Sequence, residues 1–213
     1  MKLKMTGAQL IVQLLEAQDV ELVTGIPGGA LLPLYEALGG DTRIRHVLAR
    51  HEQGAGFIAQ GLARVSGRAA VCLGTSGPGA TNLVTAIADA KLDSVPLVCI
   101  TGQVPQHLIG TDAFQEVKTT HIVETITKAN FMVRSAAELI DLIPEAFRIA
   151  ETGRPGPVLI DVPKDVQRET IEVDTTRLPR RAARIAEAPD AIAITMAAEL
   201  IAQARKPVLY LGG

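Results

Sequence analysis

Short apolar segments alternate along the chain with longer segments of helical periodicity. The apolar segments are rich in β-branched residues and are ELVTG near position 21, IRHVLA near 44, AAVCLG near 69, PLVCITG near 96, ANFMV near 129 and PVLIDV near 157. Strands that alternate with helices are typical of a parallel sheet. The pattern therefore predicts an α/β domain in which a parallel sheet is flanked by helices on both faces.

The spacing of apolar residues supports the predicted helices. Thr6 and Gln9 have the spacing of a capping box, and apolar stripes of period 3.6 follow in four places. The stripes are Leu10, Ile11, Leu14 and Leu15; Ala55, Ile58, Ala59, Leu62 and Ala63; Ala80, Leu83, Val84, Ile87 and Ala88; and Leu139, Ile140, Ile143, Phe147 and Ala150. Pro144 predicts a kink or a restart within the last stripe, and Gly153 predicts its end.

The pattern changes after residue 170. Residues 171–190 are rich in charge and contain two prolines, which is typical of a linker. Residues 191–213 then have the pattern of a helix, a turn and a strand that ends on Gly212 and Gly213. Because a strand that ends in glycines normally leads into a ligand loop, we expect a first domain over residues 1–170 and the truncated start of a second α/β domain over residues 191–213.

Composition excludes several classes of function. Apolar residues make up 47% of the chain and charged residues 21%, which favours a folded globular protein. The net charge of -2 and the 3% of aromatic residues argue against nucleic-acid binding. No apolar run approaches the roughly 20 residues of a membrane span, and the chain does not begin with a secretion signal. We therefore expect a cytoplasmic protein that contacts no membrane.

The cysteines and histidines do not indicate a metal site. Cys72 and Cys99 each lie inside an apolar run, so we expect both to be reduced, buried thiols. The four histidines lack the close spacing of metal ligands. The sequence predicts no metal site.

Glycine-rich loops follow four of the predicted strands. These loops are GIPGGA at 25–30, RHEQGAG at 50–56, GTSGPGATN at 74–82 and TGQ at 101–103. Each glycine lets a ligand approach the main chain, and a parallel sheet gathers all four loops at one edge. Glycine in one such turn is usually there for packing, but four together favour a flat ligand. None of the loops has the lysine of a P-loop or the spacing G-x-G-x-x-G. Pro78 is predicted to be a first helical residue, with Ser76 or Thr75 near the cap.

Glu52 is the candidate acid at this edge. An acid in the first turn of a helix complements the helix dipole by roughly 0.3 to 1 kcal/mol, which is a purely structural reason for it. Alternatively, a carboxyl that is partly desolvated at the ligand edge can share a proton with a ligand nitrogen. Spacing alone leaves both interpretations open.

Six long motifs in one order carry a resemblance to a known family. They are GIPGGALLPLYEAL, RHEQGAGFIAQGLAR, TSGPGATNLVTAIADA, PLVCITGQVP, GTDAFQE and GRPGPVLIDVPKDVQ. Over residues 4–213 the chain resembles the N-terminal, pyrimidine-binding domain of thiamine-diphosphate-dependent enzymes, specifically the large catalytic subunits of acetolactate (acetohydroxyacid) synthases. Ile26 departs from the tyrosine that many relatives carry at this position.

The resemblance implies an activity for the full-length protein. Such enzymes condense two pyruvates, or pyruvate and 2-oxobutyrate, with loss of CO2 in branched-chain amino-acid biosynthesis. The implied cofactors are thiamine diphosphate, Mg2+ and FAD, with the last two bound mostly outside this chain. A homodimer or tetramer and a regulatory small subunit are the implied partners, and this chain alone is expected to be inactive. The alternatives are another thiamine-diphosphate-dependent decarboxylase or acyltransferase, and a non-catalytic dimerisation module.

The resemblance also implies roles for individual residues. Glu52 matches the glutamate that hydrogen-bonds the aminopyrimidine ring and favours the tautomer that removes a proton from the thiazolium carbon. Gln115 matches a polar residue that points at the reaction centre. The matching cofactor contacts, besides Glu52, are Gly29, Pro78 and Asn82. The matching residues of the substrate channel are Ala30, Pro105, Phe114 and Lys164.

Overall fold

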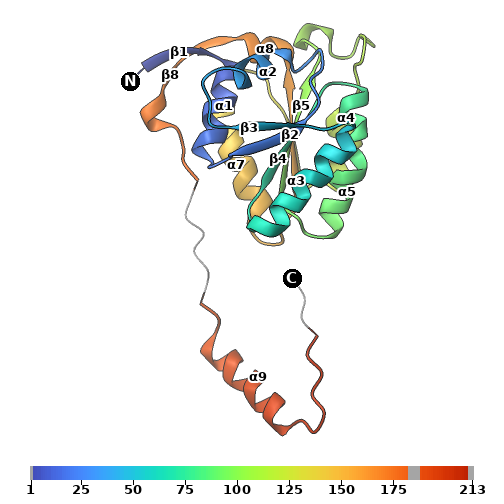
Figure 1. The fold of residues 1–213 in the computed structure, drawn as a ribbon, viewed down its shortest axis with the longest axis vertical. Coiled ribbons are helices and arrows are strands. Elements are labelled where there is room, and N and C mark those ends of the chain that lie inside the picture. Colours follow the sequence, from blue (N-terminus) through green and yellow to red (C-terminus); the bar gives the residue numbers. More distant parts are fainter. Residues whose placement is uncertain (1, 182–187, 211–213) are drawn as a thin grey trace. The chain divides into compact units, whose positions relative to one another are not determined.

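The first part of the chain contains a six-stranded parallel sheet. The computed structural model describes residues 2–181 and 188–210, and it divides into two compact units, residues 1–181 and 182–213. In the first unit the strand order is β3-β2-β4-β5-β7-β6, and every neighbouring pair is parallel (Figure 1). The strands are β2 (Leu22–Gly25), β3 (Arg45–Leu48), β4 (Ala70–Gly74), β5 (Leu97–Gln103), β6 (Ala129–Met132) and β7 (Pro157–Pro163). The predicted α/β class and its six strands are confirmed.

Helices cover both faces of this sheet because strand side chains alternate in direction. Val71 and Leu73 of β4 pack into one core, with apolar residues of α1 (Gly7–Ala17), α2 (Leu32–Leu38), α7 (Leu139–Glu151) and α8 (Lys164–Arg168). Ala70 and Cys72 pack into the opposite core, with residues of α3 (Glu52–Ser66) and α5 (Val84–Leu92). The remaining short helices of this unit are α4 (Pro78–Asn82), α6 (Thr119–Ile122) and the 3-10 helices Gln106–Leu108, Glu124–Ile126 and Thr175–Arg177.

The predicted starts and ends of α1 and α7 agree with the structure. Thr6 Oγ1 accepts a hydrogen bond of 3.2 Å from the Gln9 amide, and Gln9 Oε1 accepts one of 2.9 Å from the Thr6 amide. This is the predicted capping box. Pro144 lies inside α7, which runs without a restart to Glu151, and Gly153 follows it with a φ of 59°. Cys72 and Cys99 are free, buried thiols, as predicted.

Helix α3 turns a different face inward from the one its sequence predicts. Ala55, Ala59 and Ala63 are buried, but Ile58 and Leu62 are 45% and 39% exposed. The reason is close packing: a Cβ added at Gly56 would lie 2.5 Å from the Ala86 Cβ on α5. Small residues allow this approach, and the branched side chains of α3 are left on the outside.

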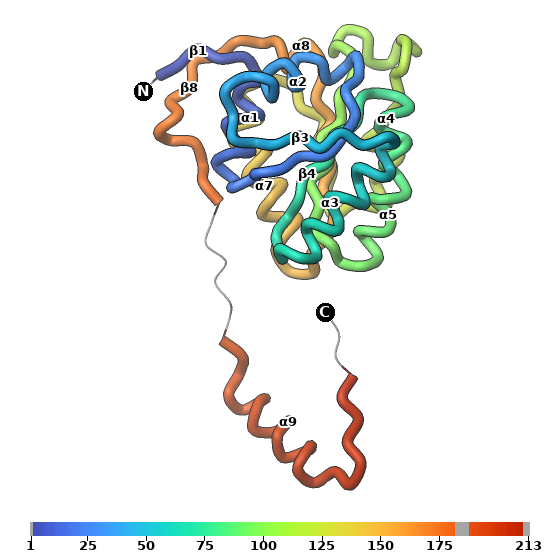
Figure 2. The backbone as a smooth tube through the Cα atoms, viewed as in Figure 1, coloured from blue at the N-terminus to red at the C-terminus, as the bar shows by residue number. Residues whose placement is uncertain are grey.

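A two-stranded antiparallel ribbon was missed by the sequence pattern. It joins β1 (Lys2–Thr6) to β8 (Thr170–Asp174), which lie side by side although they come from opposite ends of the unit (Figure 2). The predicted linker over 171–190 is therefore wrong in its first part, which carries β8. Met5 and Val173 are buried, so one face of the ribbon packs on the core. Residues 182–187 of the predicted linker lie outside the described residues.

The second unit contains helix α9 (Ala191–Gln203), where a helix was predicted. Asp190 caps it, because its Oδ1 accepts a hydrogen bond of 2.9 Å from the Ile192 amide. The described residues of the predicted strand, 207–210, have no strand structure. Residues 211–213 lie outside the described part of the chain. A strand needs a neighbour for its backbone hydrogen bonds, and the described residues of this unit provide none.

Candidate functional site

The glycine-rich loops meet at the carboxyl edge of the parallel sheet. The Ala30 amide, after β2, donates a hydrogen bond of 3.2 Å to Thr75 Oγ1, after β4. A Cβ added at Gly102 of β5 would lie 2.8 Å from the Ala30 carbonyl carbon and oxygen, so only glycine permits this contact. Gln167 Nε2 of α8 donates to the Ala30 carbonyl at 2.8 Å. The loop at 25–31 is thus held from three neighbouring elements.

Glu52 is a buried acid at this edge. It is the first residue of α3 and is 8% exposed. The N-cap His51 fixes the start of the helix, because its Nδ1 accepts a hydrogen bond of 3.2 Å from the Gln53 amide. The Glu52 Oε2 accepts a hydrogen bond of 2.9 Å from Asn82 Nδ2. Among the described residues, Glu52 has no ion pair, so its partner is a neutral amide rather than a cation.

The short helix α4 brings Pro78 and Asn82 to the same place. Pro78 is its first residue, as predicted, but the N-cap is Gly77, without a side-chain hydrogen bond. The prediction of Ser76 or Thr75 as the cap is wrong, because Thr75 binds the Ala30 amide instead. A Cβ at Gly79 would lie 3.4 Å from Glu52 Oε1. The glycine therefore leaves this second carboxylate oxygen uncovered by a side chain.

Gln115 lies against the start of α4. Gly77 and Gln115 both have a positive φ, of 61° and 60°, and a Cβ added at Gly77 would lie 2.8 Å from the Gln115 carbonyl oxygen. Glu116 stabilises this loop, because its carboxylate accepts hydrogen bonds of 2.5 Å from the Gly110 amide and 3.1 Å from the Ala113 amide. The Gly110 hydrogen bond is the main cause that lowers the pKa of Glu116. The structure thus brings Gln115 to the helix that also carries Asn82.

The other predicted site residues differ in their exposure. Gly29 is exposed, and a Cβ there would meet nothing within 4 Å, so its main chain is open to a ligand. Ala30 is buried under the loop contacts, and Phe114 is 87% exposed. Pro105 and Lys164 lie close to one another in the chain fold, since the Gln106 amide donates a hydrogen bond of 3.1 Å to Asp165 Oδ1.

Asp161 was missed by the sequence analysis. It is fully buried in β7, where it accepts hydrogen bonds of 2.7 Å from Thr101 Oγ1 and 3.0 Å from Gln103 Nε2. Burial raises the pKa of Asp161 to about 7. Gln103 Nε2 also donates to the Val117 carbonyl at 2.9 Å, so this cluster anchors the end of the loop that carries Gln115. The sequence feature that could have indicated Asp161 is the single acid inside the otherwise apolar segment PVLIDV.

Tyr35 and His46 form a second cluster that sequence reasoning missed. The Tyr35 hydroxyl lies 3.2 Å from His46 Nε2, and the two rings meet edge to face at 5.0 Å. Burial, followed by the negative charge of Glu52, raises the pKa of Tyr35. Burial also lowers the pKa of His46. The pair therefore favours its neutral form and presents a hydroxyl within the electrostatic reach of Glu52.

This arrangement can hold a flat, nitrogen-containing ligand. A carboxylate oriented by a neutral amide is able to hold or accept a proton from a ring nitrogen, whereas a cation would keep it ionised. The open main chain at Gly29 and the uncovered oxygen of Glu52 leave room for such a ring. A parallel sheet with a buried acid and glycine-rich loops at its carboxyl edge thus defines a ligand-binding α/β domain.

Comparison with known proteins identifies the family. The profile of the thiamine pyrophosphate enzyme, N-terminal TPP binding domain, matches residues 5–122, so the chain belongs to this family. The chain is 59% identical, over 99% of its length and 37% of the relative, to the acetolactate synthase isozyme 1 large subunit of Escherichia coli (strain K12). It is 54% identical to the acetolactate synthase large subunit of Corynebacterium glutamicum, over 99% of this chain and 34% of that one. For the chloroplastic acetolactate synthase of Arabidopsis thaliana the identity is 49%, over 97% and 31%.

These findings confirm the family that the motifs indicated. The chain spans about a third of the length of the curated relatives it matches. The carboxylate and amide at the sheet edge fit the pyrimidine part of thiamine diphosphate. Within the described residues, no group of three or more His, Cys, Asp or Glu could hold a metal ion. No helix in the described part of the chain is long and apolar enough to cross a membrane.

Proposed function

We propose that this chain is the pyrimidine-binding domain of an acetolactate synthase large subunit. The full-length protein then condenses two pyruvates, or pyruvate and 2-oxobutyrate, to a 2-aceto-2-hydroxy acid with loss of CO2. The observation that carries the proposal is the buried Glu52 carboxylate, which accepts a hydrogen bond from Asn82 and has no ion pair within the described part of the chain. Similarity to acetolactate synthases over 99% of the chain supports the choice of reaction.

Glu52 is the proton-handling residue in this proposal. Thiamine diphosphate supplies, when bound, a carbon nucleophile for the carbonyl group of a 2-oxo acid. Glu52 would hold or transfer a proton at its carboxylate for a nitrogen of the bound ring, and the hydrogen bond from Asn82 keeps the carboxylate in one orientation. Burial in α3 excludes water from this contact and strengthens it. Gly29 and Pro78 border the space for the ring.

The remaining residues of the edge act on the substrate side. Gln115, held against Gly77, is placed to contact the reacting groups, and Ala30, Pro105, Phe114 and Lys164 lie along the path of the substrate. The positive charge of Lys164 attracts the carboxylate of a 2-oxo acid. Mg2+ and FAD are assigned to parts of the longer protein, with the cofactor diphosphate.

The proposed assembly is a homodimer or tetramer in the cytoplasm, with a regulatory small subunit as a further partner. Apolar side chains exposed along α3 support an oligomer. Phe57, Ile58 and Leu62 are between 39% and 45% exposed, and Val65 is 90% exposed. Exposed apolar side chains that gather on one helix mark a protein interface.

The test is the Glu52→Gln variant of the full-length protein. We expect acetolactate formation from pyruvate to fall by about 10² to 10⁴-fold, the usual contribution of general acid–base catalysis, with the folded structure intact. Glu124→Gln is the matched control, because Glu124 is an exposed acid in a first helical turn. Activity of Glu52→Gln within about twofold of the unchanged protein would contradict the assignment of Glu52 as the proton-handling residue.

A product assay separates the other candidates. Pyruvate as sole substrate gives acetolactate in a synthase, whereas another thiamine-diphosphate-dependent decarboxylase or acyltransferase gives a different product. A dimerisation module gives no product at all. The exposed face of α3 is the observation that favours this last alternative.

A further inference from the structure

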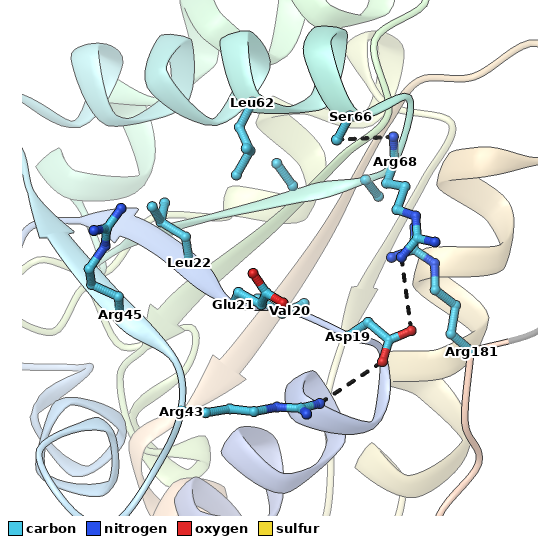
Figure 3. A pocket seen from close by; sticks show the side chains of 12 residues that line it. Asp19, Val20, Glu21, Leu22, Arg43, Arg45, Leu62, Ser66, Arg68 and Arg181 are labelled. Carbon is cyan, nitrogen blue, oxygen red and sulfur yellow. Dashed lines mark hydrogen bonds and ion pairs between the residues drawn. The ribbon is translucent and has the colours of Figure 1, made fainter.

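A cavity lies at the amino edge of the sheet, opposite to the edge that carries Glu52. Its volume is about 890 Å3, and it opens where β2, β3 and β4 begin (Figure 3). Its wall carries four guanidinium groups and two carboxylates, from Arg43, Arg45, Arg68, Arg181, Asp19 and Glu21. Neither the proposed catalysis nor the cofactor edge uses these residues.

The positive charges of this arginine cavity are poorly neutralised by its own acids. Asp19 is shared between two guanidiniums, since Arg43 and Arg68 each lie 3.9 Å from one of its oxygens. Both distances are longer than a charge-assisted hydrogen bond. Arg45 has no ion pair among the residues that the structure describes. Arg43 also donates a hydrogen bond of 2.5 Å to the Glu16 carbonyl, so the spare guanidinium donors of the cavity are mainly those of Arg45 and Arg68.

Two of the guanidiniums lie next to one another. Figure 3 shows the head groups of Arg68 and Arg181 side by side on the wall of the cavity. Burial, and then the positive charge of Arg68, lower the pKa of Arg181, while Asp19 acts in the opposite direction. Arg181 is fixed in this position by its ion pair with Glu151 and by a hydrogen bond of 3.1 Å from its Nη1 to the Gln18 carbonyl. Glu151 neutralises Arg181, and an anion placed between the two head groups would also neutralise Arg68.

We propose that the arginine cavity binds a phosphate-bearing small molecule. The guanidinium groups of Arg43 and Arg68, which share Asp19, and that of Arg181 suit a tetrahedral dianion better than a planar carboxylate, because each fork can bind a different pair of oxygens. The volume exceeds that of inorganic phosphate and is in the range of small-molecule sites. Leu22 and Ala70 provide an apolar wall for the organic part of the ligand.

The test measures binding to the 213-residue chain by NMR of the arginine Nε–Hε groups. The probes are ribose 5-phosphate, ribose and inorganic diphosphate, titrated at matched ionic strength. We expect ribose 5-phosphate and diphosphate to shift the Arg68 and Arg181 signals in a saturable way, and ribose to leave them unchanged. Arg68→Gln and Arg43→Gln should each weaken binding by about tenfold, the usual loss for one charge-assisted contact.

Two controls keep the result specific. The side chains of Arg43 and Arg68 are 60% and 59% exposed, so their variants should fold, which far-ultraviolet circular dichroism verifies. Arg134→Gln removes an exposed arginine outside the cavity and should leave binding unchanged. The proposal is overturned if sodium chloride shifts the arginine signals as much as the phosphates do, if ribose binds as well as its phosphate, or if Arg134→Gln weakens binding as much as Arg68→Gln.

Discussion

The side-chain amide of Asn82 donates a hydrogen bond of 2.9 Å to the carboxylate of Glu52. The two residues come from different helices, α4 and α3, and are 30 positions apart in the chain. A neutral donor orients the buried acid without fixing its charge, as a lysine or arginine would. The hydrogen bond therefore accounts for an acid among glycines and small residues, and it leaves the second carboxylate oxygen for a ligand.

Removing this donor should disturb the acid more than the fold. In Asn82→Ala the buried Oε2 loses its hydrogen bond, which destabilises the folded chain by about 1 to 3 kcal/mol. In Asn82→Asp a second carboxylate faces the first, and we expect a larger loss of acetolactate formation in the full-length protein than in Asn82→Ala. Urea unfolding and the product assay measure the two effects. Asn130→Ala is the control, because its amide makes only a 3.5 Å contact with Thr127.

Asp161 should make stability fall as the pH rises from about 4 to about 7. Its pKa is 3.8 in an ordinary environment and about 7 in the folded protein. Between these two values the folded state binds more protons than the unfolded state, so stability decreases with increasing pH and is constant above about 7. The full difference amounts to roughly 4 kcal/mol.

The Asp161→Asn variant isolates this contribution. Asparagine keeps the shape and hydrogen-bonds Thr101 and Gln103 without a charge, so the variant should gain stability relative to the unchanged chain between pH 4 and pH 7. Urea unfolding at pH 5 and pH 8 measures the difference. Equal pH dependence in both proteins would show that Asp161 stays ionised in the folded state over this range.

The strands of the sheet could be predicted because the central ones are mostly apolar. Every residue of β4, β5 and β7 is buried, and such runs give a clear signal. The ribbon of β1 and β8 gave no such signal in the sequence, because its strands carry lysines and acids on their exposed face. The inward face of α3 was also predicted wrongly, because periodicity cannot show that alanine and glycine allow a close approach that Ile58 and Leu62 would prevent.

The candidate site was predictable in part. Loop composition placed Glu52 and the glycines at one edge, since topology fixes where parallel strands end. The contacts themselves depend on tertiary structure. The backbone of Gln115 against Gly77 and the hydrogen bonds of Asp161 to β5 join residues far apart in sequence, and local patterns contain no information on such pairs.

Cofactor binding by the 213-residue chain should be weak. The chain spans about a third of its relatives' length, and the resemblance assigns the diphosphate and Mg2+ contacts to other parts of those proteins. We therefore expect calorimetry with thiamine diphosphate and Mg2+ to give a Kd above about 1 mM, because the pyrimidine contacts alone contribute only a few kcal/mol. Micromolar binding would show that the diphosphate contacts lie within this chain.

Gly77 should tolerate alanine much less than Gly153, although both glycines have a positive φ. Their φ angles are 61° and 59°. Alanine at a positive φ incurs a penalty of about 1 to 2 kcal/mol. The backbone cost is larger at Gly77, because its ψ of -117° lies outside the left-handed region that other residues can adopt. At Gly153 the added Cβ meets nothing within 4 Å, whereas at Gly77 it would lie 2.8 Å from the Gln115 carbonyl oxygen. Overpacking of this kind adds about 1 to 3 kcal/mol.

The comparison of Gly77→Ala with Gly153→Ala therefore measures the joint cost of the backbone conformation at Gly77 and of the contact with Gln115. Urea unfolding should show the larger loss of stability for Gly77→Ala, and in the full-length protein only this variant should lower acetolactate formation, because the Gln115 loop must move away from α4. Equal losses of stability and unchanged product formation in both variants would mean that the position of Gln115 does not depend on Gly77. In that case the loop after β5 adapts freely, and the role proposed for Gln115 would have to rest on contacts outside this chain.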